Sequence, residues 1–175
     1  AWDMFPTALF SLSITVAVAK SETKGRAVEA VVDLPFGTVS GNLLQASKEF
    51  LGVPFASPPE RFATSQPWTS PYPGGRWEAK RFQAQCLQLD ETLGGQVQMV
   101  ANFSEDCLFL NIYTPLEVAP QRGWPVMFWI HGGGFIMGTA NMPLFNASVL
   151  AARENVVVVS ANYRLGAFGF AATLP

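Results

Sequence analysis

The sequence predicts an α/β fold whose sheet begins with antiparallel strands, continues with parallel ones and carries a flanking helix. Two observations predict it. Residues 30–56 contain short apolar strand patterns separated by tight turn signals, as in antiparallel neighbours. Residues 125–163 then alternate strand, glycine loop, helix and strand, the order that joins parallel strands. The 175 residues are enough for one domain with a buried core.

Charge and composition narrow the classes of partner. The formal net charge is -2 and no basic cluster occurs, so the sequence gives no sign of a nucleic-acid partner. Hydrophobic residues make up 49% and charged residues only 14%. Such an apolar composition suggests that part of the surface is covered by another polypeptide or by lipid.

Residues 1–20 form an apolar leader. The run from Met4 to Ala19 carries no charge, and as a helix it would measure about 24 Å, short of a ~30 Å hydrocarbon core. It resembles the core of a secretory signal, with a small-residue cleavage site at its end. An uncleaved helix would serve as a membrane anchor, with the following basic residues outside the lipid, or as an arm packed on a neighbour; we favour the anchor.

Residues 21–30 read as a polar linker, and residues 31–175 as the domain proper. Its first strands are a hairpin over 30–44 with a Pro-Phe-Gly turn, followed by a strand over 50–56. The stretch 57–83 is rich in proline, glycine and aromatic residues, so we expect an ordered loop held by aromatic contacts.

The second half of the chain shows two strands around a glycine loop and a helix. Cys107 to Tyr113 reads as a strand, and Pro125 to Ile130 as a short buried strand that stops at three consecutive glycines. Glycines at such a place let the backbone approach a ligand and direct its N–H groups to one point. Residues 147–154 read as a helix capped by Asn146, and residues 156–163 as a buried strand.

Four stretches, in this order, resemble the type-B carboxylesterase/cholinesterase family, which has the α/β-hydrolase fold. The strongest is His-Gly-Gly-Gly-Phe after a strand, the motif of lipase and esterase oxyanion holes. The resemblance runs from about Val31 to the last residue but covers only the first third of a typical member. It therefore implies a truncated sheet with an open edge. The four stretches are Phe50–Ala56 with Pro58-Pro59 and Arg61-Phe62, Ser104–Asn111, His131–Phe135, and Asn162–Gly166 with Gly169-Phe170.

The resemblance implies roles for the residues of the glycine motif. Gly133 and Gly134 would supply the N–H groups that stabilise an oxyanion, and Gly132 would permit the turn. His131, the single histidine of the chain, would brace the loop rather than act as a base.

Four charged residues stand within otherwise apolar motifs. Buried charges persist when they are paired, so we expect structural ion pairs of Arg61 with Glu105 and of Asp106 with Arg164.

Cys86 and Cys107 fit no zinc pattern, and the sequence predicts neither a metal nor a cofactor. The resemblance implies that they form a disulfide worth about 3 kcal/mol in an oxidising compartment; the alternative is two free thiols. Asn102 and Asn146 begin Asn-x-Ser sequons and are candidate glycosylation sites.

The sequence lacks the reactive groups of a serine hydrolase. It contains no Gly-x-Ser-x-Gly and no second histidine. We therefore expect a domain that is inactive alone and acts as an accessory subunit of a membrane-associated assembly. Neighbouring subunits would cover the open sheet edge, and Met4 to Ala19 would contact the membrane.

Two other interpretations stay open. In one, the chain is the amino-terminal piece of an active carboxylic-ester hydrolase that acts on a small ester. In the other, it is a secreted binding module. All three interpretations place the domain on the secretory, lumenal or extracellular side of a membrane.

Overall fold

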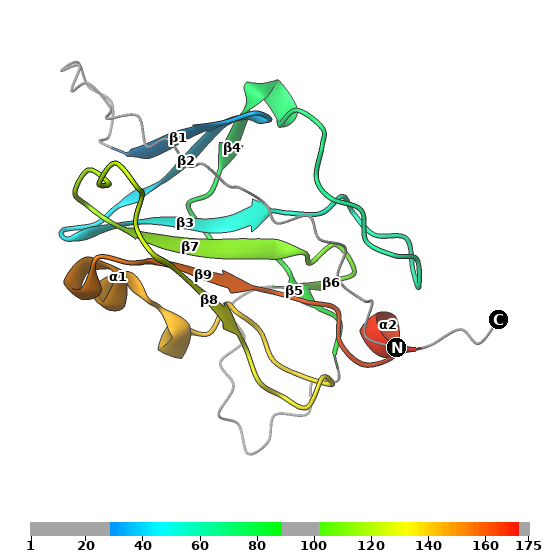
Figure 1. Ribbon diagram of the computed structural model, residues 1–175. Helices are drawn as coiled ribbons and strands as arrows, with labels where there is room; N and C mark the ends of the chain where they lie inside the picture. Colours follow the sequence, from blue (N-terminus) through cyan, green and yellow to red (C-terminus); the bar gives the residue numbers. More distant parts are fainter. Residues whose placement is uncertain (1–28, 89–101, 172–175) are drawn as a thin grey trace.

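The computed structural model describes residues 29–88 and 102–171 (Figure 1). The expected leader at 1–20 and almost all of the linker at 21–30 lie outside these residues. No helix within the described ranges is long and apolar enough to cross a membrane.

A seven-stranded sheet forms the body of the structure. Its strand order is β1-β2-β3-β7-β9-β8, and β4 pairs with β2 beside this path. Two short strands, β5 and β6, pair separately. The strands are β1 (Ala30–Leu34), β2 (Gly37–Leu43), β3 (Ser47–Pro54), β4 (Arg76–Glu78), β5 (Gln85–Cys86), β6 (Phe103–Ser104), β7 (Phe109–Pro115), β8 (Val126–Ile130) and β9 (Val157–Ala161).

The predicted change from antiparallel to parallel pairing is confirmed. Strands β1, β2, β3, β7 and β9 pair antiparallel along the main path, whereas β8 pairs parallel to β9. The parallel register runs from Val126 opposite Val157 to Ile130 opposite Ala161. The carboxyl end of β8, where the glycines begin, therefore lies beside the carboxyl end of β9.

Helix α1 (Ser148–Glu154) joins β8 to β9 and lies against the sheet (Figure 1). Its Ala151 is buried in a cluster with Leu51, Tyr113 and Val158 from three strands. The Asn146 side chain, predicted to cap the helix, accepts a hydrogen bond from the N–H of Ser148 at 3.0 Å, but the N-cap residue is Ala147, one position later. The remaining helical turns are η1 (Pro73–Gly75), η3 (Pro143–Phe145) and α2 (Gly166–Phe170).

Aromatic contacts hold the loop over residues 57–83, as the sequence indicates. The ring of Tyr72 lies 5.9 Å from that of Trp68 and 5.8 Å from that of Trp77, measured between centroids. Strand β4, which the sequence did not predict, lies within this loop and pairs parallel to β2.

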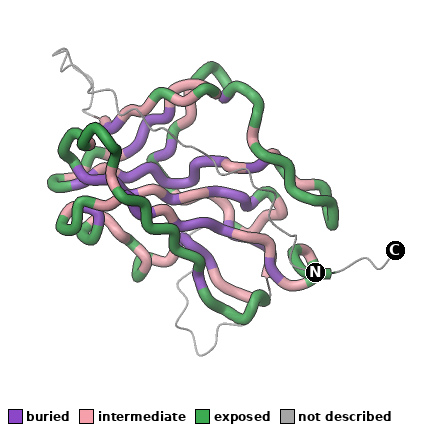
Figure 2. Tube along the Cα trace, in the orientation of Figure 1, coloured by how far each residue is buried: buried purple, intermediate pink, exposed green. Residues whose placement is uncertain are grey.

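The prediction that residues 125–130 form a buried strand is correct for the strand and wrong for its burial. All five residues of β8 are exposed, from 46% at Trp129 to 64% at Val126 and Ile130 (Figure 2). Among the described strands β8 is the last of the sheet and pairs only with β9, and no described element buries its side chains. This strand is the open edge that the resemblance implies.

Candidate functional site

The glycine loop, residues 132–138, follows β8 and contains positive φ angles that few residue types adopt. The φ angles are +127° at Gly133, +60° at Gly134 and +64° at Phe135. Side chains with a Cβ rarely occupy this region, which explains why glycines stand at the first two positions. Gly132 was expected to permit the turn, but its φ is not positive. Gly133 and Gly134 make the turn instead.

Close packing adds a second requirement for glycine at position 133. A Cβ at Gly133 would lie 1.9 Å from the carbonyl oxygen of Met137. The carbonyl oxygen of Gly133 accepts hydrogen bonds from the N–H groups of Ile136 and Met137, each at 3.2 Å. The loop therefore folds back on itself and fixes the orientation of the Gly133 peptide.

Two amide groups of this turn have no acceptor in the part of the chain that the structure describes. Gly133 and Gly134 are both exposed, and within the described ranges neither N–H donates a hydrogen bond. A Cβ at Gly132 or Gly134 would meet no atom of residues 29–88 or 102–171 within 4 Å, so these residues leave the space in front of the turn open. Fixed, unpaired N–H groups facing open space are suited to bind an anionic oxygen.

His131 lies beneath the loop rather than in the open space. It is 3% exposed, and its ring stacks on that of Tyr163 with centroids 4.4 Å apart. Nδ1 lies 2.9 Å from the carbonyl oxygen of Gly132, which can only accept, so Nδ1 carries the proton. Burial lowers the pKa of His131, with an opposing effect from this backbone hydrogen bond. Its Nε2 is buried and has no partner among the described residues.

Buried asparagines hold the segment that follows the loop. The Asn162 side-chain oxygen accepts hydrogen bonds from the N–H of Ala140 at 2.8 Å and from the hydroxyl of Thr139 at 3.1 Å. Asn111, in β7, donates to the carbonyl oxygen of Ala140 at 3.2 Å and to the side-chain oxygen of Asn141 at 3.0 Å. The sequence analysis gave these asparagines no role, although a polar Asn111 within an apolar strand is the kind of residue that needs a buried partner.

Gln88 is a further residue whose role the sequence analysis missed. Its side-chain amide accepts from the N–H of Gly138 at 2.8 Å and donates to the carbonyl oxygen of the same residue at 2.9 Å. The last residue of the glycine loop is therefore held from both sides of its backbone by one side chain.

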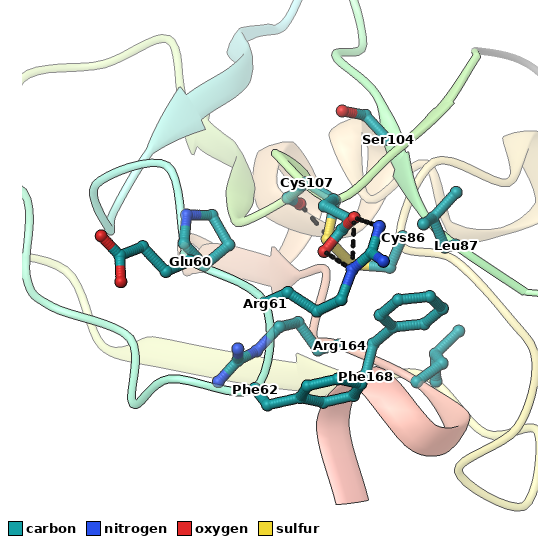
Figure 3. Close-up of a pocket in the computed structure, with 12 residues that line it drawn as sticks. Glu60, Arg61, Phe62, Cys86, Leu87, Ser104, Cys107, Arg164 and Phe168 are labelled. Carbon is teal, nitrogen blue, oxygen red and sulfur yellow. Dashed lines mark hydrogen bonds and ion pairs between the residues drawn. A yellow bond between two sulfur atoms is a disulfide. The ribbon is translucent and has the colours of Figure 1, made fainter. Parts of the chain in front are cut away.

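The structure contains the Cys86–Cys107 disulfide beside a small surface pocket (Figure 3). At the mouth of the pocket Arg61 forms an ion pair with Glu105, including a hydrogen bond of 3.0 Å from Nε to Oε1. This partner lowers the pKa of Glu105. The Arg61 side chain is 59% exposed, so the pair contributes little to stability.

The predicted ion pair of Asp106 with Arg164 does not form within the described part of the chain. Asp106 is exposed, and partial desolvation raises the pKa of its carboxyl group. The guanidinium group of Arg164 points away from that of Arg61 in Figure 3, and its Nη1 is buried with no partner among the described residues. The prediction assumed that both charges are buried, whereas Asp106 is exposed and does not require a cationic partner.

Two further sequence candidates lie on the surface. Asn102 and Asn146, the first residues of the sequons, are both exposed. Among the described residues, no three His, Cys, Asp or Glu side chains gather in a group that could hold a metal ion.

Comparisons with known proteins show the family to which this sequence is similar. The model of the carboxylesterase family matches residues 28–175. The chain is 40% identical to pig (Sus scrofa) liver carboxylesterase, over 94% of this chain and 32% of the relative. It is 37% identical to a medium-chain fatty acyl-CoA hydrolase precursor of Anas platyrhynchos, over 94% of this chain and 32% of the relative. It is 36% identical to the para-nitrobenzyl esterase of Bacillus subtilis (strain 168), over 80% of this chain and 28% of the relative.

The chain therefore spans about a third of the length of the curated relatives it matches. The family model nevertheless covers both the glycine loop and the disulfide. From the fold, the loop and these matches together, the chain belongs to the carboxylesterase family.

Proposed function

We propose that this chain supplies the oxyanion hole of a serine carboxylic-ester hydrolase, with the nucleophile and base provided by polypeptide outside these 175 residues. The observation that carries the proposal is the pair of exposed N–H groups at Gly133 and Gly134, which have no acceptor among the described residues. They sit at the carboxyl end of a parallel strand, on a turn that leaves them no internal acceptor.

Acyl transfer explains what such donors would do. When a serine attacks an ester carbonyl, the carbonyl oxygen becomes negative and the tetrahedral intermediate needs fixed donors. The two N–H groups would stabilise that oxygen, and loss of one such donor typically costs about 2.7–4 kcal/mol in the transition state. The names of the relatives, a carboxylesterase and a fatty acyl-CoA hydrolase precursor, suggest a carboxylic ester as substrate.

The described groups do not complete this chemistry. His131 is buried, and one ring nitrogen is committed to the Gly132 carbonyl, so the ring is not placed to take a proton from a nucleophile. The sequence also offers no Gly-x-Ser-x-Gly elbow. These facts support an anion hole that is inactive in these 175 residues alone.

Strand β8 supports a role for a covering polypeptide. Its free edge leaves backbone donors and acceptors unpaired beside five exposed hydrophobic side chains. The cover is either a later part of the same polypeptide, as in a complete hydrolase, or a separate subunit. With a separate subunit as the cover, the domain would have the accessory role and would stabilise an assembly without catalysis. The exposed edge supports this role and the complete hydrolase equally. A membrane contact through Met4 to Ala19 belongs to the accessory role and concerns residues outside the described ranges.

The disulfide supports a secretory or lumenal location, because such bonds persist in oxidising compartments. The exposure of Asn102 and Asn146 is compatible with glycosylation there.

One experiment separates the hydrolase from the accessory subunit. The native protein is purified, treated with a fluorophosphonate probe for activated serines, deglycosylated, and measured by intact-mass and peptide-mapping spectrometry. A labelled polypeptide well above 19.0 kDa that contains the peptide of residues 129–137 supports the hydrolase. An unlabelled species near 19.0 kDa that co-purifies with other subunits rejects the hydrolase and supports the accessory role.

A further inference from the structure

Gln88 connects the disulfide loop to the glycine loop. It lies two residues after Cys86, and its side chain reaches Gly138, which is 50 positions further along the chain. Oε1 accepts from the N–H of Gly138 at 2.8 Å, while Nε2 donates to the carbonyl oxygens of Gly138 at 2.9 Å and Cys86 at 3.1 Å. Only an amide offers one acceptor and two donors in this arrangement, so its orientation is fixed by its partners.

Gly138 is where the two ends of the glycine loop meet. A Cβ at Gly138 would lie 2.5 Å from the carbonyl oxygen of Gly132 and 2.5 Å from Nδ1 of His131. Its φ angle of +119° also requires glycine. The backbone of Gly138 therefore packs directly against the start of the loop, and any displacement of Gly138 would remove that support.

Met137, next to Gly138, connects Gly138 to the exposed amide of Gly134 through a hydrogen bond. Met137 donates its N–H to the carbonyl oxygen of Gly133 at 3.2 Å. The Gly133 carbonyl belongs to the same peptide unit as the N–H of Gly134, so fixing this oxygen fixes the direction of that donor. A short path of covalent and hydrogen bonds thus runs from Gln88 through Gly138 and Met137 to the candidate oxyanion donor.

We propose that Gln88 is a positioning residue for the anion hole, and that through it the Cys86–Cys107 disulfide controls the orientation of the Gly134 donor. The disulfide acts on Gln88 because it fixes Cys86, whose carbonyl oxygen receives the second Nε2 hydrogen. The effect on catalysis rests on the proposed function. The mechanical link, by which the disulfide and Gln88 hold the glycine loop, depends only on contacts between described residues.

Amide hydrogen exchange on the full chain tests the mechanical link. Gln88→Met keeps the side-chain length but removes all three hydrogen bonds, and Gln88→Glu keeps the size but turns a carboxylate toward two carbonyl oxygens. Both variants are expected to speed exchange of the Gly138 and Met137 amides about tenfold, while the amides of β7 keep their protection. Gln66→Met is the matched control, because Gln66 is exposed and its amide makes one bond, to the Thr64 carbonyl oxygen at 3.3 Å.

Reduction of the disulfide supplies the second arm. In the wild-type chain, reduction is expected to speed exchange of the Gly138 and Met137 amides. In Gln88→Met, reduction should speed their exchange little further, because reduction and substitution both break the same connection from Cys86 through Gln88 to Gly138. Unchanged exchange in both Gln88 variants overturns the proposal. So does full additivity of reduction and substitution.

Hydrolysis by the native full-length protein tests the catalytic meaning. With a p-nitrophenyl ester, Gln88→Met should lower kcat about tenfold and change KM less than about twofold, as expected for a donor that acts mainly in the transition state. A wild-type kcat in this variant overturns the catalytic half of the inference. Absence of hydrolysis by the wild-type protein rejects the proposed function instead, and the exchange results still decide whether Gln88 positions the loop.

Discussion

The hydroxyl of Tyr163 donates a hydrogen bond of 2.9 Å to the carbonyl oxygen of His131, whose imidazole stacks on the ring of the same tyrosine with planes 15° apart. One residue thus holds both the backbone and the side chain of His131. Because His131 is the last residue before the glycines, Tyr163 fixes the point from which the glycine loop leaves β8.

Acidification should destabilise the fold through His131. Burial lowers its pKa below the ordinary value of 6.5, so the unfolded chain binds the proton more readily than the folded one. The stability that this neutral ring contributes is present above pH 6.5 and is lost as the pH falls toward its lower folded pKa. Urea unfolding between pH 7 and pH 5 should show a decreasing free energy of unfolding, and His131→Phe should flatten the slope.

His131 is the only histidine, so nuclear magnetic resonance of its Cε1 proton reports its pKa directly. A folded-state pKa at or above 6.5 would contradict this prediction.

The three glycines should differ sharply in their tolerance of alanine. Gly133→Ala places a Cβ 1.9 Å from a carbonyl oxygen at a positive φ and should cost about 2–3 kcal/mol. Gly134→Ala meets open space but keeps the φ of +60°, so about 1 kcal/mol is expected. Gly132→Ala has neither problem and serves as the control, within about 0.5 kcal/mol of the wild type. Chemical denaturation measures all three, and equal costs at positions 132 and 133 would refute the loop geometry.

Removal of the disulfide should lower the free energy of unfolding by about 3 kcal/mol, because the bond closes a loop between residues 21 positions apart. Cys86→Ser with Cys107→Ser is compared with the wild type under oxidising conditions. Under reducing conditions the two proteins should unfold alike. A difference that survives reduction would show that the cysteines stabilise the fold by packing rather than by their bond.

A second, more acidic transition should arise at Glu78. Hydrogen bonds from Arg76, Lys80 and Ser40 lower the pKa of Glu78 from 4.5 to about 2. The stability contributed by this carboxylate is therefore present above pH 4.5 and is lost as the pH falls toward about 2. Glu78→Gln should reduce the pH dependence of unfolding in that window and leave the decrease expected from His131 between pH 7 and pH 5 unchanged. Because the Glu78 side chain is 56% exposed, 0.5 M salt should weaken the effect; salt independence would argue against it.

Local signals predicted most of the fold and part of the site. The hairpin, the strand after it, helix α1 and the turn at the three glycines all follow from residues close together in sequence. The Arg61–Glu105 pair also forms as expected. The burial of β8 did not follow, because an apolar composition indicates that a strand is meant to be covered and not whether the described chain covers it.

The contacts that sequence reasoning missed are long-range. Gln88 reaches Gly138 across 50 positions, and Asn162 reaches Ala140 across 22. Neither residue stands in a periodic pattern, and their roles become visible only when the sheet brings the segments together. Conversely, Asp106 and Arg164 both stand in apolar motifs, yet one is exposed and the other turned elsewhere.

Strand β8 also has a consequence for how the protein is made. A bare strand with apolar side chains on both faces is a template on which identical chains can stack, as in fibrils. During synthesis β8 leaves the ribosome before β9, the strand with which it pairs. The interval is one in which a chaperone has to shield residues 126–130, and slowing translation after Ile130 should increase aggregation.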